Sequence, residues 1–234
     1  MKKLTIIFLF LISYYSHAFK LMPMSYTIKS SDKSKTALFT VLNDSDSPIA
    51  IQLDIRVRKM KVDGSEEHPE SDDFLIFPDQ LVLGAKKRRV IKVKWLKGEV
   101  KDIEKSYRLI AEQLPIDVTK KKAKQTDIKI LLRYIAALYV EPEKGSSKLK
   151  VISSKTTKDL NRVVFYVENS GNIHQALLKP TLTITQEGKS FQVTNLEGIR
   201  GENILAMTKR YFSFIPPKGV NIQKPYSVEL VNDD

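Results

Sequence analysis

The chain contains no cysteine, so neither a disulfide nor a thiolate can contribute to its fold or its chemistry. Small exported domains often depend on disulfides, and a chain without them must be stabilised by burying a hydrophobic core. Its 234 residues are enough for one large or two ordinary domains. The lack of cysteine also excludes thiol catalysis and thiolate metal sites.

Histidine is scarce as well, which argues against most kinds of active site. Beyond residue 18 the only histidines are His68, in an acidic segment, and His174, in the other half of the chain. There is no G-x-S-x-G nucleophile motif, no metal-binding H-E-x-x-H and no glycine-rich phosphate loop. The adjacent acids Glu66-Glu67 and Asp72-Asp73 are interpreted as solvated residues of polar turns. We expect no catalytic site, no metal site and no cofactor.

A long apolar run is also missing, apart from a short one at the start. Residues 1–18 carry two lysines, the apolar stretch from Leu4 to Ile12, and small residues at Ser16-His17-Ala18. This order is typical of an export signal, and it predicts a mature chain that begins near Phe19. A bilayer span needs about 20 apolar residues, so no stable membrane insertion is expected.

The charge is one-sided, with 39 Lys and Arg against 27 Asp and Glu and a formal net charge of +12. Such a surface suits nucleic acid, an anionic membrane surface or acidic proteins, and export argues against nucleic acid. The densest basic run, from Lys120 to Gln125, is interpreted as a solvated loop that could also steer acidic partners.

Short alternating runs dominate the rest of the sequence and predict an all-β fold. Ile51, Leu53, Ile55 and Val57 alternate with polar residues, which is the period of a half-buried strand. A turn signal follows at residues 62–65, and no long stretch has a helical period. Many short strands with turns between them favour antiparallel β-sandwiches.

The chain divides into two similar halves at residues 141–147, where Glu141-Pro142-Glu143-Lys144-Gly145-Ser146-Ser147 reads as a linker. In each half a strand ends in an asparagine turn, at Asn43 and at Asn169. We therefore expect two immunoglobulin-like β-sandwich domains at an angle to each other, one over residues 19–141 and one over residues 148–234.

Several segments, taken in order, resemble the periplasmic pilus chaperones of the chaperone–usher pathway, specifically the archaic branch. The matching segments are Val41-Leu42-Asn43 with Pro48, Pro78 to Val93, Tyr107-Arg108-Leu109 with Glu112 to Pro115, Leu132 to Pro142, and Val167 to His174. The chain departs from the family pattern at Ala137, where a proline is frequent, and at Ser25, near where the better-known branch has an arginine.

This resemblance implies a periplasmic protein that is not an enzyme and whose partners are pilus subunits and an outer-membrane usher. Such chaperones bind subunits that lack the last strand of their own sandwich, and they complete the fold by lending a strand. An unpaired strand edge otherwise invites aggregation. Fimbrium assembly by donor-strand complementation is thus the implied function.

The candidate donor strand runs from Ile128 to Tyr134. Ile128, Ile130, Leu132 and Tyr134 lie on one face of this strand and are predicted to fill the subunit groove. Burying an aliphatic side chain contributes about 1.5–3 kcal/mol, whereas an exposed ion pair contributes about 0–1 kcal/mol. We therefore expect the apolar face to supply the affinity.

Three basic residues, Arg108, Lys129 and Arg133, are predicted to bind the terminal carboxylate of the subunit. A hairpin between the two strands is expected to bring Arg108 beside Lys129 or Arg133. Guanidinium groups bind carboxylates through two parallel hydrogen bonds.

Two other interpretations remain open at the level of the sequence. One is a two-domain surface adhesin or binding protein, in which the segment from Ile128 to Tyr134 would be an ordinary paired strand. The other is a chaperone homologue adapted to a different export system.

Overall fold

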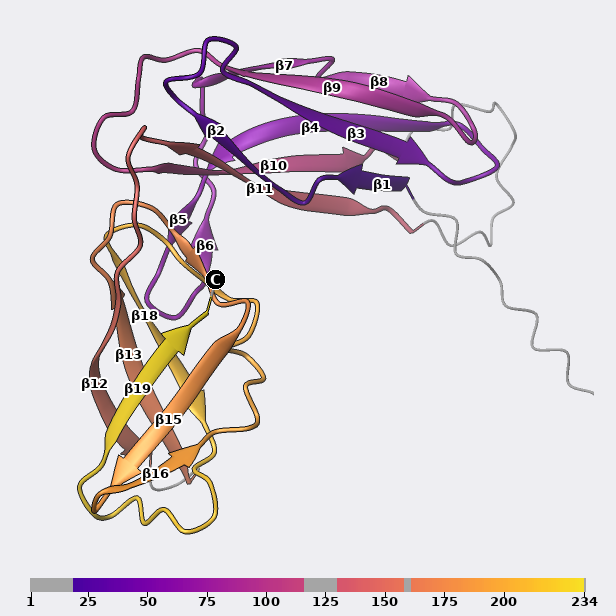
Figure 1. Cartoon of the computed structure of the whole chain (residues 1–234). Coiled ribbons are helices and arrows are strands. Elements are labelled where there is room, and N and C mark those ends of the chain that lie inside the picture. The colour runs from indigo at the N-terminus through magenta and orange to yellow at the C-terminus, as the bar shows by residue number, and fades with distance from the viewer. Residues whose placement is uncertain (1–18, 116–129, 158–160, 234) are drawn as a thin grey trace, which may run out of the picture.

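The computed structural model describes residues 19–115, 130–157 and 161–233. The regular structure in these ranges consists of β-strands. The described residues include no helix that is long and apolar enough to cross a membrane. The strands build two immunoglobulin-like sandwiches, whose long axes lie at a wide angle and give the molecule an L shape (Figure 1). The predicted export signal, the basic run from Lys120 to Gln125, and residues Ile128 and Lys129 lie outside the described residues.

The first sandwich has one sheet in the order β1-β3-β9-β7 and a second in the order β2-β11-β10-β4-β8. Its strands are β1 (Phe19–Met22), β2 (Ser25–Lys29), β3 (Thr36–Asn43), β4 (Ile49–Val57), β7 (Phe74–Phe77), β8 (Gln80–Leu83), β9 (Arg88–Trp95), β10 (Lys105–Gln113) and β11 (Arg133–Glu141). A separate hairpin of β5 (Lys59–Met60) and β6 (Glu66–Glu67) projects from the end of β4.

Side-chain alternation explains why these strands pack as a sandwich. In β4 the apolar residues Ile51, Leu53 and Ile55 are buried, as the period predicts, and the strand begins two residues before the predicted run. Buried residues of β3 and β9, including Phe39 and Ile91, close the core from the opposite sheet. The predicted strand and its inward face are thus confirmed.

The second sandwich contains sheets in the orders β12-β13-β18 and β16-β15-β19, with a small β14-β17 pair. Its strands are β12 (Leu149–Thr157), β13 (Arg162–Asn169), β14 (Gln175–Ala176), β15 (Pro180–Gln186), β16 (Lys189–Gln192), β17 (Asn203–Ile204), β18 (Thr208–Phe214) and β19 (Ser227–Asn232). Phe165, Leu182 and Phe214 lie in a core separate from that of the first sandwich. Each half therefore has the layered core of its own domain.

The asparagine turn of the first half is held by a fully buried side chain. The Asn43 amide nitrogen donates to the carbonyl oxygens of Ser47, Leu83 and Gly84 at 2.9, 3.1 and 3.0 Å. Its oxygen accepts the Ser45 backbone N–H at 3.0 Å. One amide thus satisfies backbone groups on two segments that are about 40 residues apart in sequence.

The second half uses the same arrangement at Asn169, which is also fully buried. Its amide nitrogen donates to the carbonyls of Ile173 and Ile204 at 2.8 and 3.2 Å. Its oxygen accepts backbone N–H groups of Gly171 and Lys148, both at 3.0 Å. The predicted similarity of the two turns is confirmed, and it extends to the partners of each amide.

The β5–β6 hairpin bridges the two domains, as the ribbon also shows (Figure 1). The Tyr211 backbone N–H of β18 donates to the Val62 carbonyl at 2.9 Å. Gly64 lies at the tip with φ +87°, and a Cβ built there would stand 1.9 Å from Nη2 of Arg210. Only glycine has the conformational freedom and the small size that this contact requires.

A second junction joins the segment before β10 to the turn after β13. The buried carboxylate of Glu104 lies 2.7 Å from His174 Nδ1, and the Glu104 N–H donates to the Asn172 carbonyl at 3.0 Å. The His174 ring stacks on Tyr139, with ring centroids 3.6 Å apart and planes 8° from parallel. These contacts fix one domain against the other and explain why this turn carries a histidine.

Candidate functional site

One edge of β11 is open at its start. The strand pairs with β10 from Arg133 to Val140, whereas β2 pairs with it only from Ala137 onward. The backbone from Arg133 to Ala136 therefore has a strand neighbour on one side only, as far as the described strands extend. Unpaired backbone N–H and C=O groups along such an edge can bind a strand from another chain.

A second edge, beside the first, is also open in the part of the chain that the structure describes. Strand β1 is the terminal strand of its sheet and pairs with β3, and the chain then crosses between Met22 and Ser25 to join β11 as β2. The start of β11 lies next to β1 at the end of the sandwich far from the second domain (Figure 1). The Phe19 and Tyr134 rings meet edge to face there, with centroids 4.9 Å apart.

The side chains at this end continue the core outward. Leu132 and Tyr134 are half-buried and pack on the same core as Ala136 and Leu138. Ile130 continues this alternation and is 76 % exposed. On the opposite face Leu131 and Ile135 are exposed as well. An open edge with apolar side chains is typical of a surface that accepts a partner strand.

The structure does not bring Arg108 and Arg133 together in the way that the sequence suggested, and Lys129 lies outside the described residues. Arg108 pairs across the sheet with Ala137, and Arg133 pairs with Glu112. Four residues of a strand separate the two positions by about 13 Å, so the expectation that Arg108 lies beside Arg133 is wrong. The side chains of both do point from the same face of the sheet, and Arg133 is exposed.

Arg108 instead binds a carboxylate of its own chain. Its Nε and Nη2 donate to the two oxygens of Glu66 at 2.8 and 2.6 Å. Nη2 of Arg58 lies 2.7 Å from the same carboxylate, and Nε2 of His68 lies 2.9 Å from it. Arg58 also donates to the Tyr139 hydroxyl at 2.8 Å. This network lies on the face of the sheet that carries the hairpin.

The interpretation of Glu66 as a solvated acid is therefore wrong, since its side chain is only 15 % exposed. Sequence reasoning also missed Arg58 and Tyr139. Adjacent acids usually lie in solvent, and the partners of Glu66 come from β10 and from the end of β4. The only signal in the sequence for this network was a pair of arginines, Arg56 and Arg58, at alternate positions. It did not indicate that Arg58 binds Glu66 and Tyr139.

The environment of Glu66 strongly favours its ionised form. Burial alone would raise its pKa, but hydrogen bonds from Arg108 and His68 and the nearby charge of Arg58 outweigh burial and lower the pKa to about 2. For Tyr139, burial is the largest effect and raises the pKa. The Glu66 carboxylate is thus charged throughout the ordinary pH range.

Glu66 should make the stability of the chain depend on acidic pH. Its pKa is about 2 in the folded chain against an ordinary value of 4.5, so its contribution is complete above pH 4.5 and is lost as the pH falls toward 2. The shift corresponds to about 3 kcal/mol. We expect Glu66→Gln to remove this part of the pH dependence, as measured by urea unfolding at a series of pH values.

Glu67→Gln is the matched control, because Glu67 is its neighbour on β6 and is largely exposed beside Lys61. It should leave the pH dependence nearly unchanged. Parallel stability curves for Glu66→Gln and the parent chain between pH 4.5 and 2 would contradict the assignment.

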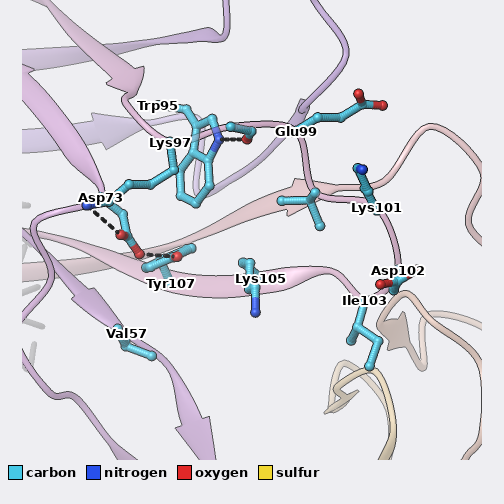
Figure 2. A pocket seen from close by; sticks show the side chains of 12 residues that line it. Val57, Asp73, Trp95, Lys97, Glu99, Lys101, Asp102, Ile103, Lys105 and Tyr107 are labelled. Atoms are coloured by element: carbon cyan, nitrogen blue, oxygen red, sulfur yellow. Dashed lines mark hydrogen bonds and ion pairs between the residues drawn. The ribbon is translucent and has the colours of Figure 1, made fainter.

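A cavity of about 780 Å³ lies apart from the open edge, at the end of the first domain nearer the junction (Figure 2). Its lining polar groups bond to one another: Trp95 Nε1 donates to the Gly98 carbonyl at 2.8 Å, and Tyr107 donates to Asp73 at 2.5 Å. Lysines and acids both occur around it. Because these groups do not converge on a common point, we assign no ligand to this cavity.

Comparisons with known proteins agree with this geometry. Residues 21–146, more than half of the chain, match the family model described as pili and flagellar-assembly chaperone, PapD N-terminal domain. No curated protein matches the chain in sequence.

Solved structures share the fold at low identity. The CsuC–CsuE chaperone–tip adhesion subunit complex from the archaic Csu pili of Acinetobacter baumannii has a TM-score of 0.60 at 15 % identity, covering 90 % of this chain and 97 % of that one. The class 5 fimbriae chaperone CfaA has a TM-score of 0.58 at 14 % identity, with 91 % and 98 % covered. The Salmonella enterica SafA pilin–SafB chaperone complex has a TM-score of 0.56 at 16 % identity, with 83 % of each chain covered.

The expected pair of immunoglobulin-like sandwiches is thus confirmed by the strands and by these neighbours. The family match covers the first domain, and the open strand edge and the two-domain all-β fold agree with it. The chain belongs to the family of pili and flagellar-assembly chaperones.

Proposed function

We propose that the protein is a periplasmic chaperone of the archaic branch, which binds pilus subunits by donor-strand complementation and delivers them to an outer-membrane usher. The observation that carries this proposal is the open edge from Arg133 to Ala136, with exposed Ile130 beside it. The sequence of residues 1–18 supports export. The chaperone–subunit complexes among the structural neighbours support the class of partner.

The open edge has the properties that strand addition requires. Backbone groups from Arg133 to Ala136 pair with the strand of the subunit, and apolar side chains on alternate positions enter its groove. Leu132 and Tyr134 already face the core of the first domain, so a sandwich added at this edge extends that core. Ile130 lies further along the same face of the donor segment and fills the groove beyond it. Ile128 lies outside the described residues, and the alternation of the sequence assigns it the same role.

The terminal carboxylate of the subunit is bound by basic residues next to this edge. Arg108 is the main candidate because of its position in the sheet. It pairs with Ala137, and Ala137 pairs with Ser25, which is the first residue of β2 that pairs with β11. Arg133, which lies toward the open end, acts on the register of the added strand together with Lys129, which lies outside the described residues. The open edge also favours a chaperone over a surface adhesin, in which this strand would have two neighbours.

The proposal is tested by coexpressing the exported chain with pilus subunits from the same genome in a bacterial periplasm. The chaperone is purified through a C-terminal tag, and the subunit recovered per chaperone is measured. We expect a soluble one-to-one complex, and subunits that aggregate equally with and without the chain would overturn the proposal.

Arg108→Ala is expected to lower subunit recovery about tenfold or more, since a charge-assisted bidentate contact contributes about 1.5–3 kcal/mol. Arg56→Ala is the control, because Arg56 lies directly across the sheet from Arg108 and pairs with the exposed Glu70. Equal recovery with both variants would exclude Arg108 as the anchor.

A further inference from the structure

The proposed carboxylate anchor already holds a carboxylate in the free chain. Two nitrogens of Arg108 donate to the two oxygens of Glu66, which is the bidentate geometry that guanidinium forms with any carboxylate. A terminal carboxylate of a peptide has the same charge and the same pair of oxygens. Glu66 therefore occupies the position that such a ligand would take.

The charges around Glu66 exceed what one side chain needs. Two guanidinium groups, from Arg58 and Arg108, and the imidazole of His68 surround a single carboxylate. Arg58 is buried and has a second partner in Tyr139, whereas Arg108 pairs only with Glu66 in the described part of the chain and is 18 % exposed. Arg108 is therefore the member of the network that can change partners.

The position of the network fits the end of an added strand. A strand that runs parallel to β11 along its open edge must stop where β2 begins, at the Ser25–Ala137 pair. Its C-terminal carboxylate then lies on one side of Ala137, and Arg108 lies directly opposite, on the other side of Ala137 in β10. Only the small side chain of Ala137 stands between the carboxylate and Arg108.

Glu66 belongs to a short element with few bonds of its own. Strand β6 has two residues, and among the described strands it pairs only with β5, as Lys59 with Glu67 and Met60 with Glu66. The same hairpin contacts the second domain through Val62 and Gly64. A displacement of Glu66 would therefore change the contacts that this hairpin makes with the second domain.

We propose that Glu66 is a resident carboxylate that occupies Arg108 in the free chaperone and is displaced by the terminal carboxylate of a bound subunit. This inference rests on the proposed function. Occupation by Glu66 lowers the apparent affinity for subunits by the fraction of time that Arg108 is engaged. Occupation by Glu66 also keeps Arg108 from binding unrelated anions before a subunit arrives. Displacement of Glu66 by the subunit then loosens the β5–β6 hairpin.

The first test measures the hairpin in the parent protein by hydrogen exchange, free and in complex with a coexpressed pilus subunit. We expect peptides that cover residues 59–67 to lose protection on binding, while peptides over Asn169 in the second domain keep theirs. Equal or greater protection of residues 59–67 in the complex would overturn the inference.

The second test compares Glu66→Gln with the control Glu67→Gln in the coexpression assay, at matched stability of the purified chains. Glu66→Gln should raise the apparent affinity for the subunit by about tenfold, and Glu67→Gln should not change it. A subunit extended by two glycines at its C-terminus, which moves its carboxylate, should lose this gain. Unchanged or reduced binding by folded Glu66→Gln would make Glu66 a brace of the hairpin and overturn the inference.

The donor strand separates this inference from the proposed function. If Ile130→Asp still recovers the subunit, the proposed function fails. If Ile130→Asp loses the subunit while residues 59–67 keep their protection in the parent complex, only the role of Glu66 fails.

Discussion

Ile130→Asp is expected to abolish the recovery of pilus subunits while leaving the fold of the chaperone intact. In the free chain Ile130 is 76 % exposed and lies outside the strand ladder, so a charge there meets solvent. In a complex the same side chain would enter an apolar groove. The lost burial of isoleucine and the unpaired carboxylate together cost about 4 kcal/mol or more, which lowers the affinity about 1,000-fold.

The measurement is subunit recovered per chaperone from a periplasmic extract, together with the thermal unfolding of the purified variant. Leu178→Asp is the matched control, because Leu178 is 67 % exposed in the second domain, far from the open edge. It should lose neither stability nor subunit. Leu132→Asp is less informative, since Leu132 packs on the core of the first domain and its replacement would also destabilise the fold. Normal recovery with Ile130→Asp would exclude this segment as the donor.

Asn43→Ala is expected to cause a large loss of stability in the first domain. Its buried amide bonds to the carbonyls of Ser47, Leu83 and Gly84 and to the N–H of Ser45. Alanine leaves several of these buried groups unpaired, at about 1–3 kcal/mol for each group that water cannot reach. A loss of about 3 kcal/mol is a large part of the 5–15 kcal/mol that stabilises a typical domain.

Urea unfolding is followed by the fluorescence of Trp95, the single tryptophan, which reports on the first domain, and by far-UV circular dichroism, which reports on both domains. The midpoint should fall for Asn43→Ala and stay within about 0.5 kcal/mol of the parent for Asn195→Ala. Asn195 is the control because it is exposed and makes one local bond, to the N–H of Glu197. Equal midpoints for the two variants would show that the buried amide of Asn43 contributes little.

Much of the fold could be predicted because the signals for it are local. Alternation in β4 depends on residues within one strand, and the asparagine turns depend on residues within a few positions of Asn43 and Asn169. The change of composition at residues 141–147, from which we predicted a linker, is likewise visible along the sequence. These features need no knowledge of which strand lies next to which.

The site was only partly predictable because it depends on pairing between distant strands. The sequence indicated the apolar segment that contains Ile130 and Leu132, but the open edge exists because β2 starts to pair with β11 only at Ala137. The register of β10 against β11 decided that Arg108 lies opposite Ala137 and away from Arg133. A shift of two residues would have kept the same faces and changed both neighbours.

The sequence by itself determined the all-β class, the two halves and the inward faces of the strands, because alternation and turn residues act over short distances. The apolar donor segment is a prediction of the same alternation. Only the tertiary structure decided that Glu66 meets Arg108, 42 residues away, and that Arg58 reaches Tyr139. A hairpin had to fold across the sheet before these charges could meet. No pattern along the chain specifies that approach, since it depends on how separate strands pack.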